Sequence, residues 1–388
     1  MHPVTLAIAA GSISTLIWIY LLLGRGRFWL IATPEVPVSN NSAAVAVIVP
    51  ARDEAGVIAQ SISSLLRQDH RGSLHVVLVD DGSRDGTVQI AKQAAEDLEQ
   101  ASRLTVVAGK QLPPGWSGKL WALNQGIEMA AELRPDFFVF TDADVVHGSH
   151  SVAELVGIAE REGYDLVSFM VKLHCRKDSE KLLIPAFIFF FFMLYPPAWI
   201  CDPKRRTAGA AGGCILIKPE ALARAGGIEG IRGQIIDDCA LARKVKDSGG
   251  RIWMGTSASS QSIRPYRSAF DIGGMISRTA FNQLRHSGWM LLVAVAGLIL
   301  TYIVPIALLF TQYVSLVSLG AILWFVMAIA YLPTIMLYRL HPLWALTLPL
   351  AAVFYLGATL HSAFRYWMGR GGRWKGRVQD PVKTSAAR

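Results

Sequence analysis

Cysteine is scarce in this chain and is not arranged as a metal-binding or disulfide framework. Only four cysteines occur among 388 residues, and no two of them have CxxC spacing. Neither a zinc site built on cysteine pairs nor a disulfide-stapled fold is therefore indicated. The apolar or helical context of each favours buried, reduced thiols at Cys175, Cys201, Cys214 and Cys239.

Charged residues are also few for a soluble enzyme. They make up 17% of the chain, against 52% hydrophobic residues, and the mean hydropathy is +0.36. This balance is too apolar for an ordinary soluble enzyme, yet acidic motifs interrupt the apolar segments, so we expect a membrane protein with a soluble domain. The formal net charge of +9 comes from basic residues beside apolar segments and in the tail. Anionic lipid headgroups are therefore the expected partner, not nucleic acid.

The amino-terminal head carries neither Lys nor Arg, and no A-x-A site lies directly before Gly24–Arg27. Both absences argue against a cleaved signal peptide. The run Val4–Leu23 contains about 20 apolar residues, enough to cross a hydrocarbon core of roughly 30 Å as a helix. We predict an uncleaved anchor, and the arginines that follow it place the next segment in the cytoplasm by the positive-inside rule.

Three further apolar segments near the carboxyl end are candidate spans, at Trp289–Phe310, Val314–Tyr338 and Leu343–Leu360. Three crossings would leave the basic tail, residues 365–388, on the far side of the membrane. Positive-inside counting disfavours that arrangement, so it stays open whether one segment is re-entrant or interfacial.

Between the apolar segments the pattern is that of an α/β domain. Short β-branched or aromatic runs alternate with apolar residues at helical spacing, which predicts a Rossmann-like, mostly parallel sheet. Ligands of such sheets bind at the carboxyl ends of the strands. The expected strands are 45–49, 74–79, 104–107, 137–140 and 214–217, and the expected helices begin near 58, 88, 118 and 239.

Acidic pairs follow two of these strands, and a third pair opens a predicted helix. Asp80-Asp81 precedes Gly82, which permits a tight turn. Asp142 and Asp144 stand two residues apart after a strand end, where one carboxylate can reach a metal while the other binds a sugar or orients water. Hard carboxylate oxygens as ligands favour Mg2+ or Mn2+ over zinc.

The third acidic pair, Asp237-Asp238, follows a glycine-containing loop. A carboxylate at a helix start is commonly an N-terminal cap, and we interpret Asp237 in that way. Asp238 is the candidate general base, which would take a proton from an attacking hydroxyl.

Taken together, these motifs resemble those of inverting glycosyltransferases of family 2 with the GT-A fold. The similarity is greatest to the hopene-associated glycosyltransferases and more distant to ceramide glucosyltransferases. It implies a hexosyltransferase that uses a UDP-sugar donor and a divalent cation, with direct displacement and inversion. The motifs that carry it are Val45–Glu54, Val79–Thr87, Asp142–Asp144 and Asp237-Asp238, within a stretch that ends at His286.

The resemblance also assigns residues. It implies that Asp144 holds the metal and that Asp238 is the base. Gly209–Gly213 is similar to the family's small-residue acceptor loop, which places Gly212 and Gly213 on the acceptor side. The residues assigned to the nucleotide sugar are Pro50, Asp53, Glu54, Asp80, Asp81, Lys119, Asp142 and Arg285, and Gln283 is assigned to the acceptor side.

One motif departs from the family pattern. Processive members carry Q-x-x-R-W, whereas this chain has Gln283 and Arg285 followed by His286. Without that tryptophan a polymer channel is less expected. Two alternatives to lipid glycosylation stay open: a processive polysaccharide synthase-like enzyme, and a non-catalytic membrane protein with a degenerate transferase domain.

The segment 182–200 is long enough to cross a membrane. A crossing there would place Asp144 and Asp238 on opposite faces, so we interpret its phenylalanine run as an interfacial or lipid-facing element, with an aromatic core helix as the alternative. The expected protein is multi-pass in the bacterial inner (cell) membrane, with a lipid acceptor. Its predicted parts are an anchor (1–24), a linker (25–44), a cytoplasmic GT-A domain (45–286), membrane helices (287–364) and a basic tail (365–388).

Overall fold

A computed structural model describes residues 3–31, 42–369, 373–374 and 377–378. These residues form two compact units. The sheet unit contains 42–174 and 199–264, and the helical unit contains 3–31, 175–198 and 265–369. The stretch 45–286 taken as one domain from the sequence therefore contributes to both units. Residues 32–41 of the predicted linker and most of the predicted basic tail lie outside the described residues.

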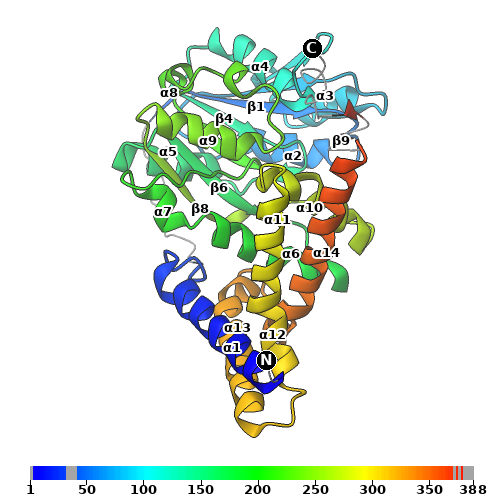
Figure 1. The fold of residues 1–388 in the computed structure, drawn as a ribbon. Coiled ribbons are helices and arrows are strands. Elements are labelled where there is room, and N and C mark those ends of the chain that lie inside the picture. The colour runs from blue at the N-terminus through cyan, green and yellow to red at the C-terminus, as the bar shows by residue number, and fades with distance from the viewer. Residues whose placement is uncertain (1–2, 32–41, 370–372, 375–376, 379–388) are drawn as a thin grey trace, which may run out of the picture. The chain divides into compact units, whose positions relative to one another are not determined.

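The sheet unit is built on one mixed sheet of eight strands, in the order β3-β2-β1-β4-β7-β6-β8-β5 (Figure 1). Its first four strands are parallel, as the strand–helix alternation predicts, but β7 runs antiparallel to both β4 and β6. The strands are β1 (Val45–Ala51), β2 (Leu74–Asp80), β3 (Leu104–Ala108), β4 (Phe137–Thr141), β5 (Val145–Val146), β6 (Leu166–Lys172), β7 (Cys214–Ile217) and β8 (Ile252–Ser262).

Helices cover both faces of this sheet, which is why every residue of β1 is buried. Alternate β1 residues, from Val45 to Ala51, pack against α2 (Ile58–Leu66), α3 (Thr87–Glu96) and α5 (Ser151–Glu162). The other face receives α4 (Gly118–Ala131), at whose Gly126 an added Cβ would come within 2.4 Å of Ile48. The glycine thus lets α4 sit directly on β1 and β2. The remaining helices of the unit are α8 (Pro219–Arg224) and α9 (Asp237–Asp247).

Among the described residues, five helical segments are long and apolar enough to cross a membrane, and all belong to the helical unit except for the last three residues of Asp178–Cys201. They include the predicted anchor, the segment around 182–200 and the three predicted carboxyl-terminal spans. The segments are Pro3–Gly24, Asp178–Cys201, Gly288–Leu308, Val314–Leu337 and Pro342–Trp367. Their principal helices are α1 (Pro3–Ile19), α6 (Asp178–Leu194), α11 (Gly288–Leu298), α13 (Val314–Leu337) and α14 (Leu348–Trp367), accompanied by α10 (Ala269–Gln283), α12 (Val304–Leu308) and the short α7 (Pro197–Cys201).

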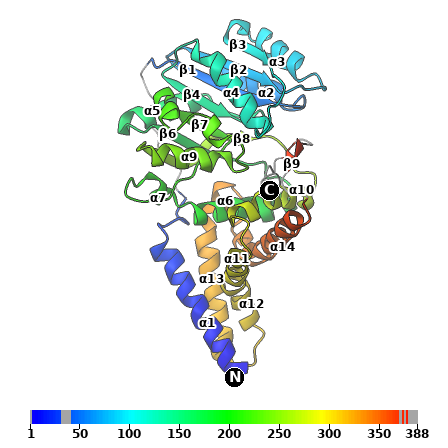
Figure 2. The same ribbon diagram turned by 45° about the horizontal axis from the view of Figure 1, so that its top comes forward.

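Helix α6 differs from the other four segments in its packing. In its most apolar window 56% of residues are buried, against 22–39% in the others. Phe189 packs edge-on against Phe28 and Tyr331, and Phe190 against Tyr302. Figure 2 shows α6 running across α13 rather than along it.

The predicted lipid-facing role of the α6 phenylalanines is therefore wrong for three of them. Phe189, Phe190 and Phe192 are 0%, 7% and 1% exposed. Phe189 and Phe190 meet aromatic side chains from distant segments, which a single-sequence pattern does not reveal, so the core-helix alternative describes all three buried residues. Phe187 and Phe191 are half-buried.

Candidate active site

The acidic motifs of the sheet unit gather where its parallel strands end. Asp80 is the last residue of β2, and Asp142 follows the last residue of β4. Helices α4 and α9 both begin at this edge, α4 with Ser117, whose hydroxyl accepts a hydrogen bond from the Leu120 N–H at 3.3 Å. The helix starts bring Lys119 and Asp238 to the same place, as the sequence predicts for ligands of such a sheet.

Lys119 lies between two of these carboxylates. Its Nζ is 2.8 Å from Asp142 Oδ1 and 3.6 Å from Asp237 Oδ2. Burial lowers the pKa of Lys119, but the negative charges of Asp142 and Asp237 outweigh this effect and the net shift is upward. The ammonium is therefore held charged. Asp237, taken from the sequence as a simple helix cap, also belongs to this ion-pair group.

Asp238 has the environment expected of a general base. Its Oδ2 accepts a hydrogen bond from the Gly212 N–H at 2.8 Å, and its Oδ1 accepts one from the Cys239 N–H at 2.7 Å. Burial, followed by the charge of Asp237, raises the pKa of Asp238 to about 6, although Lys119 opposes the shift. A carboxylate with such a pKa is ionised at neutral pH and is a better proton acceptor than an ordinary aspartate.

Gly212 and Gly213 lie on the predicted acceptor side of this group. A Cβ on Gly212 would come within 3.3 Å of both Asp238 Oδ2 and Lys119 Nζ, so a side chain would crowd the base. A Cβ on Gly213 would meet Val171 at 2.8 Å. A small pocket joins these groups and is lined by Pro50, Lys119, Asp142, Gly212, Asp237 and Asp238, among others.

A second ion-pair group lies around Asp144. Its Oδ2 accepts hydrogen bonds from Ser262 Oγ at 2.9 Å and from Arg264 Nε at 3.0 Å. The Nη2 of Arg264 also bonds Oε2 of Glu54, which is buried. Burial lowers the pKa of Arg264, but Asp144 and Glu54 shift it upward overall. The sequence analysis missed Arg264, because a lone arginine after a strand is no signal without its distant partners.

The two loops assigned to the nucleotide interlock. Asp53, whose φ of 51° lies in the left-handed region, accepts a hydrogen bond from the Arg84 N–H at 2.9 Å. Asp80 Oδ1 accepts one from the Ser83 N–H at 3.1 Å. The largely buried Asp81 pairs with Arg52 at 3.2 Å. The end of β1 and the Asp80–Thr87 loop therefore form one surface, with Pro50 as the next-to-last residue of β1.

The donor set near Asp144 fits a divalent cation only with help from a ligand. Asp142 and Asp144 supply hard oxygens, and within the described residues the second oxygen of each carboxylate makes no hydrogen bond. No group of three or more His, Cys, Asp or Glu residues arranged for a metal occurs in the described part of the chain. Asp144 could thus contribute to a cation that also takes oxygens from a diphosphate.

Gln283 and Arg285 belong to the helical unit, whereas the other candidate residues belong to the sheet unit. The side chain of Gln283 donates a hydrogen bond to the Tyr195 hydroxyl at 2.6 Å. His286, which stands where processive family members have tryptophan, stacks on Tyr366 with ring centroids 4.0 Å apart. An aromatic contact is thus kept at that position.

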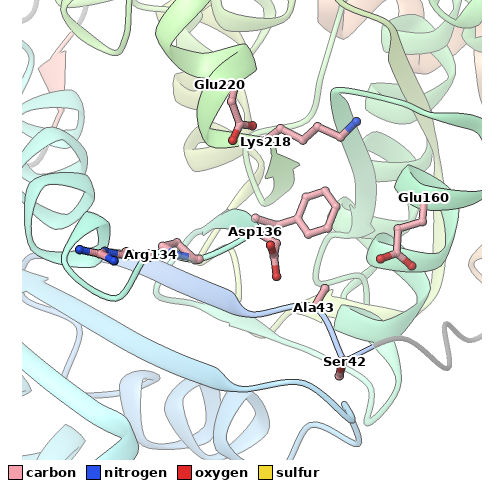
Figure 3. A pocket seen from close by; sticks show the side chains of 9 residues that line it. Ser42, Ala43, Arg134, Asp136, Glu160, Lys218 and Glu220 are labelled. Carbon is pink, nitrogen blue, oxygen red and sulfur yellow. The ribbon is translucent and has the colours of Figure 1, made fainter.

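Another hollow lies at the opposite edge of the sheet, where β1 and β4 begin (Figure 3). Its lining mixes charges of both signs, from Arg134, Asp136, Glu160, Lys218 and Glu220. None of the predicted site residues lines it. The chemistry of this chain is therefore expected at the other edge.

Comparisons with known proteins agree with this geometry. Residues 46–224 match the model of Glycosyl transferase family 2. A stretch of 129 residues is 31% identical to an undecaprenyl-phosphate 4-deoxy-4-formamido-L-arabinose transferase of Pseudomonas savastanoi, covering 32% of this chain and 34% of the relative. A stretch of 146 residues is 26% identical to a 4,4'-diaponeurosporenoate glycosyltransferase of Staphylococcus haemolyticus, covering 37% of this chain and 36% of the relative.

Among solved structures, a mannosyltransferase of Pyrobaculum calidifontis in complex with GDP-Man and Mn2+ is similar over 92% of this chain and 98% of its own, with a TM-score of 0.58 and 20% identity. That likeness establishes the fold. The sheet unit therefore has the GT-A fold, and residues 46–224 match the pattern of Glycosyl transferase family 2.

Proposed function

We propose that this protein is a membrane-bound, inverting glycosyltransferase that moves a sugar from a nucleotide-sugar donor to the hydroxyl of a membrane lipid. The observation that carries the proposal is the position of Asp238, which lies at the start of α9 beside Asp142, Lys119 and the Gly212 N–H. A hydroxyl acceptor must lose a proton as it attacks the sugar. A carboxylate with a pKa of about 6 is suited to take that proton near neutral pH.

With Asp238 as the base, the acceptor can displace the diphosphate directly. Asp238 would take the proton from the acceptor oxygen as that oxygen forms a bond to the anomeric carbon. The bond from that carbon to the donor's diphosphate breaks in the same step, so that the configuration inverts. Lys119, held charged between Asp142 and Asp237, would keep those carboxylates in place beside the sugar.

The donor is expected at the interlocked loops that follow β1 and β2. Asp80 and Asp81 would bind the nucleoside, with Asp53 and Glu54 next to them. A divalent cation bound at Asp144 would offset the charge of the leaving diphosphate. A UDP-sugar is the expected donor because the sequence resembles UDP-sugar-dependent enzymes.

A lipid acceptor is supported by the five apolar helices and by the names of two relatives. Those relatives act, by their names, on undecaprenyl phosphate and on diaponeurosporenoate. A hopanoid or other polycyclic isoprenoid alcohol is the acceptor that the sequence resemblance favours, in the bacterial inner membrane with the sheet unit in the cytoplasm. Arg25 and Arg27 after the first apolar helix support that orientation.

The proposal can be tested with the purified full chain in lipid nanodiscs that contain a hopanoid alcohol. A panel of UDP- and GDP-sugars is added with Mn2+, and release of nucleoside diphosphate is followed. We expect one donor to give release that depends on the lipid, together with a glycosylated lipid in the mass spectrum. No release with any donor would contradict the proposal. In parallel nanodiscs that contain a polyprenyl phosphate instead of the alcohol, release found only there would mean that the acceptor group is a phosphate and not a hydroxyl.

A further inference from the structure

Arg264 joins three segments that lie far apart in the sequence. Its guanidinium contacts Glu54 after β1, Asp144 after β4, and lies next to Ser262 at the end of β8, which shares Oδ2 of Asp144. The two carboxylate side chains are only 8% and 15% exposed, whereas that of Arg264 is 40% exposed. A cation thus already occupies one side of the carboxylate to which a metal is assigned.

This arrangement sets up a competition. A guanidinium and a divalent cation both seek the oxygens of Asp144. The described residues contain no group of three or more His, Cys, Asp or Glu arranged for a metal, so we expect the metal alone to bind only weakly. A diphosphate changes the balance, because it brings oxygens for the metal and a negative charge that a guanidinium can bind through two parallel hydrogen bonds. The exposed Arg264 side chain can exchange partners without uncovering the apolar core.

We propose that Arg264 is a positioning residue. In the ligand-free protein its guanidinium pairs with Asp144 and Glu54, and when the metal binds it pairs with the donor's diphosphate instead. Metal binding is thereby made dependent on the nucleotide. The protein therefore does not accumulate a metal complex without a donor. The guanidinium of Arg264 leaves its carboxylate partners and pairs with the leaving diphosphate only when a donor is present. This inference rests on the proposed nucleotide-sugar donor site.

The first arm of the test needs no nucleotide. Binding of Mn2+ alone to the full-length protein is measured by electron paramagnetic resonance of the free ion, for the wild type, Arg264→Gln and Arg224→Gln. Arg224 is a matched control, because its Nη2 pairs with Asp165 at 3.3 Å in the same unit and away from the acidic edge. We expect Arg264→Gln to bind Mn2+ about tenfold more tightly than the wild type, and the control to match the wild type.

The second arm adds UDP or GDP at saturating Mn2+. Arg264→Gln should then bind the nucleoside diphosphate about tenfold more weakly than the wild type, while Arg264→Lys, which keeps the charge but not the paired donors, falls between them. Adding Asp144→Asn to Arg264→Gln should abolish the gain in Mn2+ affinity. Circular dichroism and thermal melting confirm that each variant is folded.

Three results would overturn the inference: unchanged Mn2+ affinity in Arg264→Gln, a gain that persists in the double variant, or unchanged nucleotide affinity. Failure of the proposed function looks different, because neither UDP nor GDP would then bind the wild type at any Mn2+ concentration.

Discussion

Two ion-pair groups lie at the same edge of the sheet unit, and a single residue, Ala143, separates Asp142 of one group from Asp144 of the other. Asp142 meets Lys119 and Asp237, next to Asp238, whereas Asp144 meets Arg264 and Glu54. The first group borders the acceptor-side glycines, through the Gly212 N–H that binds Asp238. The second connects with the loops assigned to the nucleotide.

The difference shows how a short acidic motif serves two purposes. Side chains two residues apart point to the same face only within a strand. Once the strand ends and the backbone turns, they can contact different partners. The lysine group keeps its cation beside a base, and the arginine group keeps its cation where a metal and diphosphate are expected. If the proposed function is right, the pair Asp142–Asp144 separates the group that takes the proton from the group that binds the donor, and variants on each side should fail differently.

The largest effect is expected on the base side. Asp238→Asn removes the proton acceptor, so transfer should fall by roughly 100-fold or more while nucleotide affinity is retained. Steady-state kinetics measures the transfer rate, and calorimetric titration with UDP or GDP and Mn2+ measures the nucleotide affinity separately. Asp247→Asn, an exposed change on the same helix, is the control. Equal losses of affinity and turnover would make Asp238 a donor ligand instead.

The next effect is expected on the donor side. Asp144→Asn should weaken Mn2+-dependent binding of the nucleoside diphosphate by about tenfold or more, because a carboxylate ligand of the cation is lost. The fold should persist, since the residue follows a strand and is not part of the apolar core. Removal of the metal with EDTA should reduce nucleotide affinity in the wild type but make little difference to this variant. Undiminished metal-dependent binding by Asp144→Asn would contradict the assignment.

A smaller effect concerns pH. Asp238 must be ionised to act, so the transfer rate should fall as pH decreases through about 6. Lys119 lowers the pKa of Asp238, and Lys119→Met should therefore move this acid limb to higher pH. Lys119→Arg keeps the charge and should leave the limb near its original position. If the acid limb of the pH profile stays at the same pH in Lys119→Met, Lys119 does not affect the pKa of Asp238, which would contradict this prediction.

The smallest effect is on stability. The folded protein raises the pKa of Asp238 from 3.8 to about 6, so folded molecules retain this proton to higher pH than unfolded ones. Ionisation between those values therefore costs stability as pH rises. Relative to Asp238→Asn, the wild type should lose about 2 kcal/mol of stability between pH 4 and pH 7, or about 2–4 °C in melting temperature. If the melting temperatures of the wild type and Asp238→Asn change equally with pH across this range, the pKa of Asp238 is not raised in the folded protein.

Local features of the fold could be predicted from the sequence. The helix that begins at 118 starts where it is expected, after Ser117, and the strand 214–217, which follows Gly213, has the expected bounds. The acids after β2 and β4 lie where strand ends predict them. In contrast, the antiparallel β7 was not foreseen, since a short apolar strand carries no record of its direction.

The remaining features depend on contacts between distant segments. Arg264 is about 120 and 210 residues away from Asp144 and Glu54, and the single sequence contains no signal that links them. The same holds for Phe189, whose partners Phe28 and Tyr331 come from opposite ends of the chain. A run of phenylalanines indicates only that an apolar environment is needed, and packing decides whether lipid or protein supplies it.

The stereochemistry of the product tests the central claim most directly. The lipid product formed from an α-linked nucleotide sugar is isolated, and its anomeric proton is examined by nuclear magnetic resonance. Direct attack by a lipid hydroxyl deprotonated by Asp238 predicts a β-linked sugar with no phosphorus coupling at the anomeric carbon. An α-linked product, or one joined through phosphate, would contradict the account.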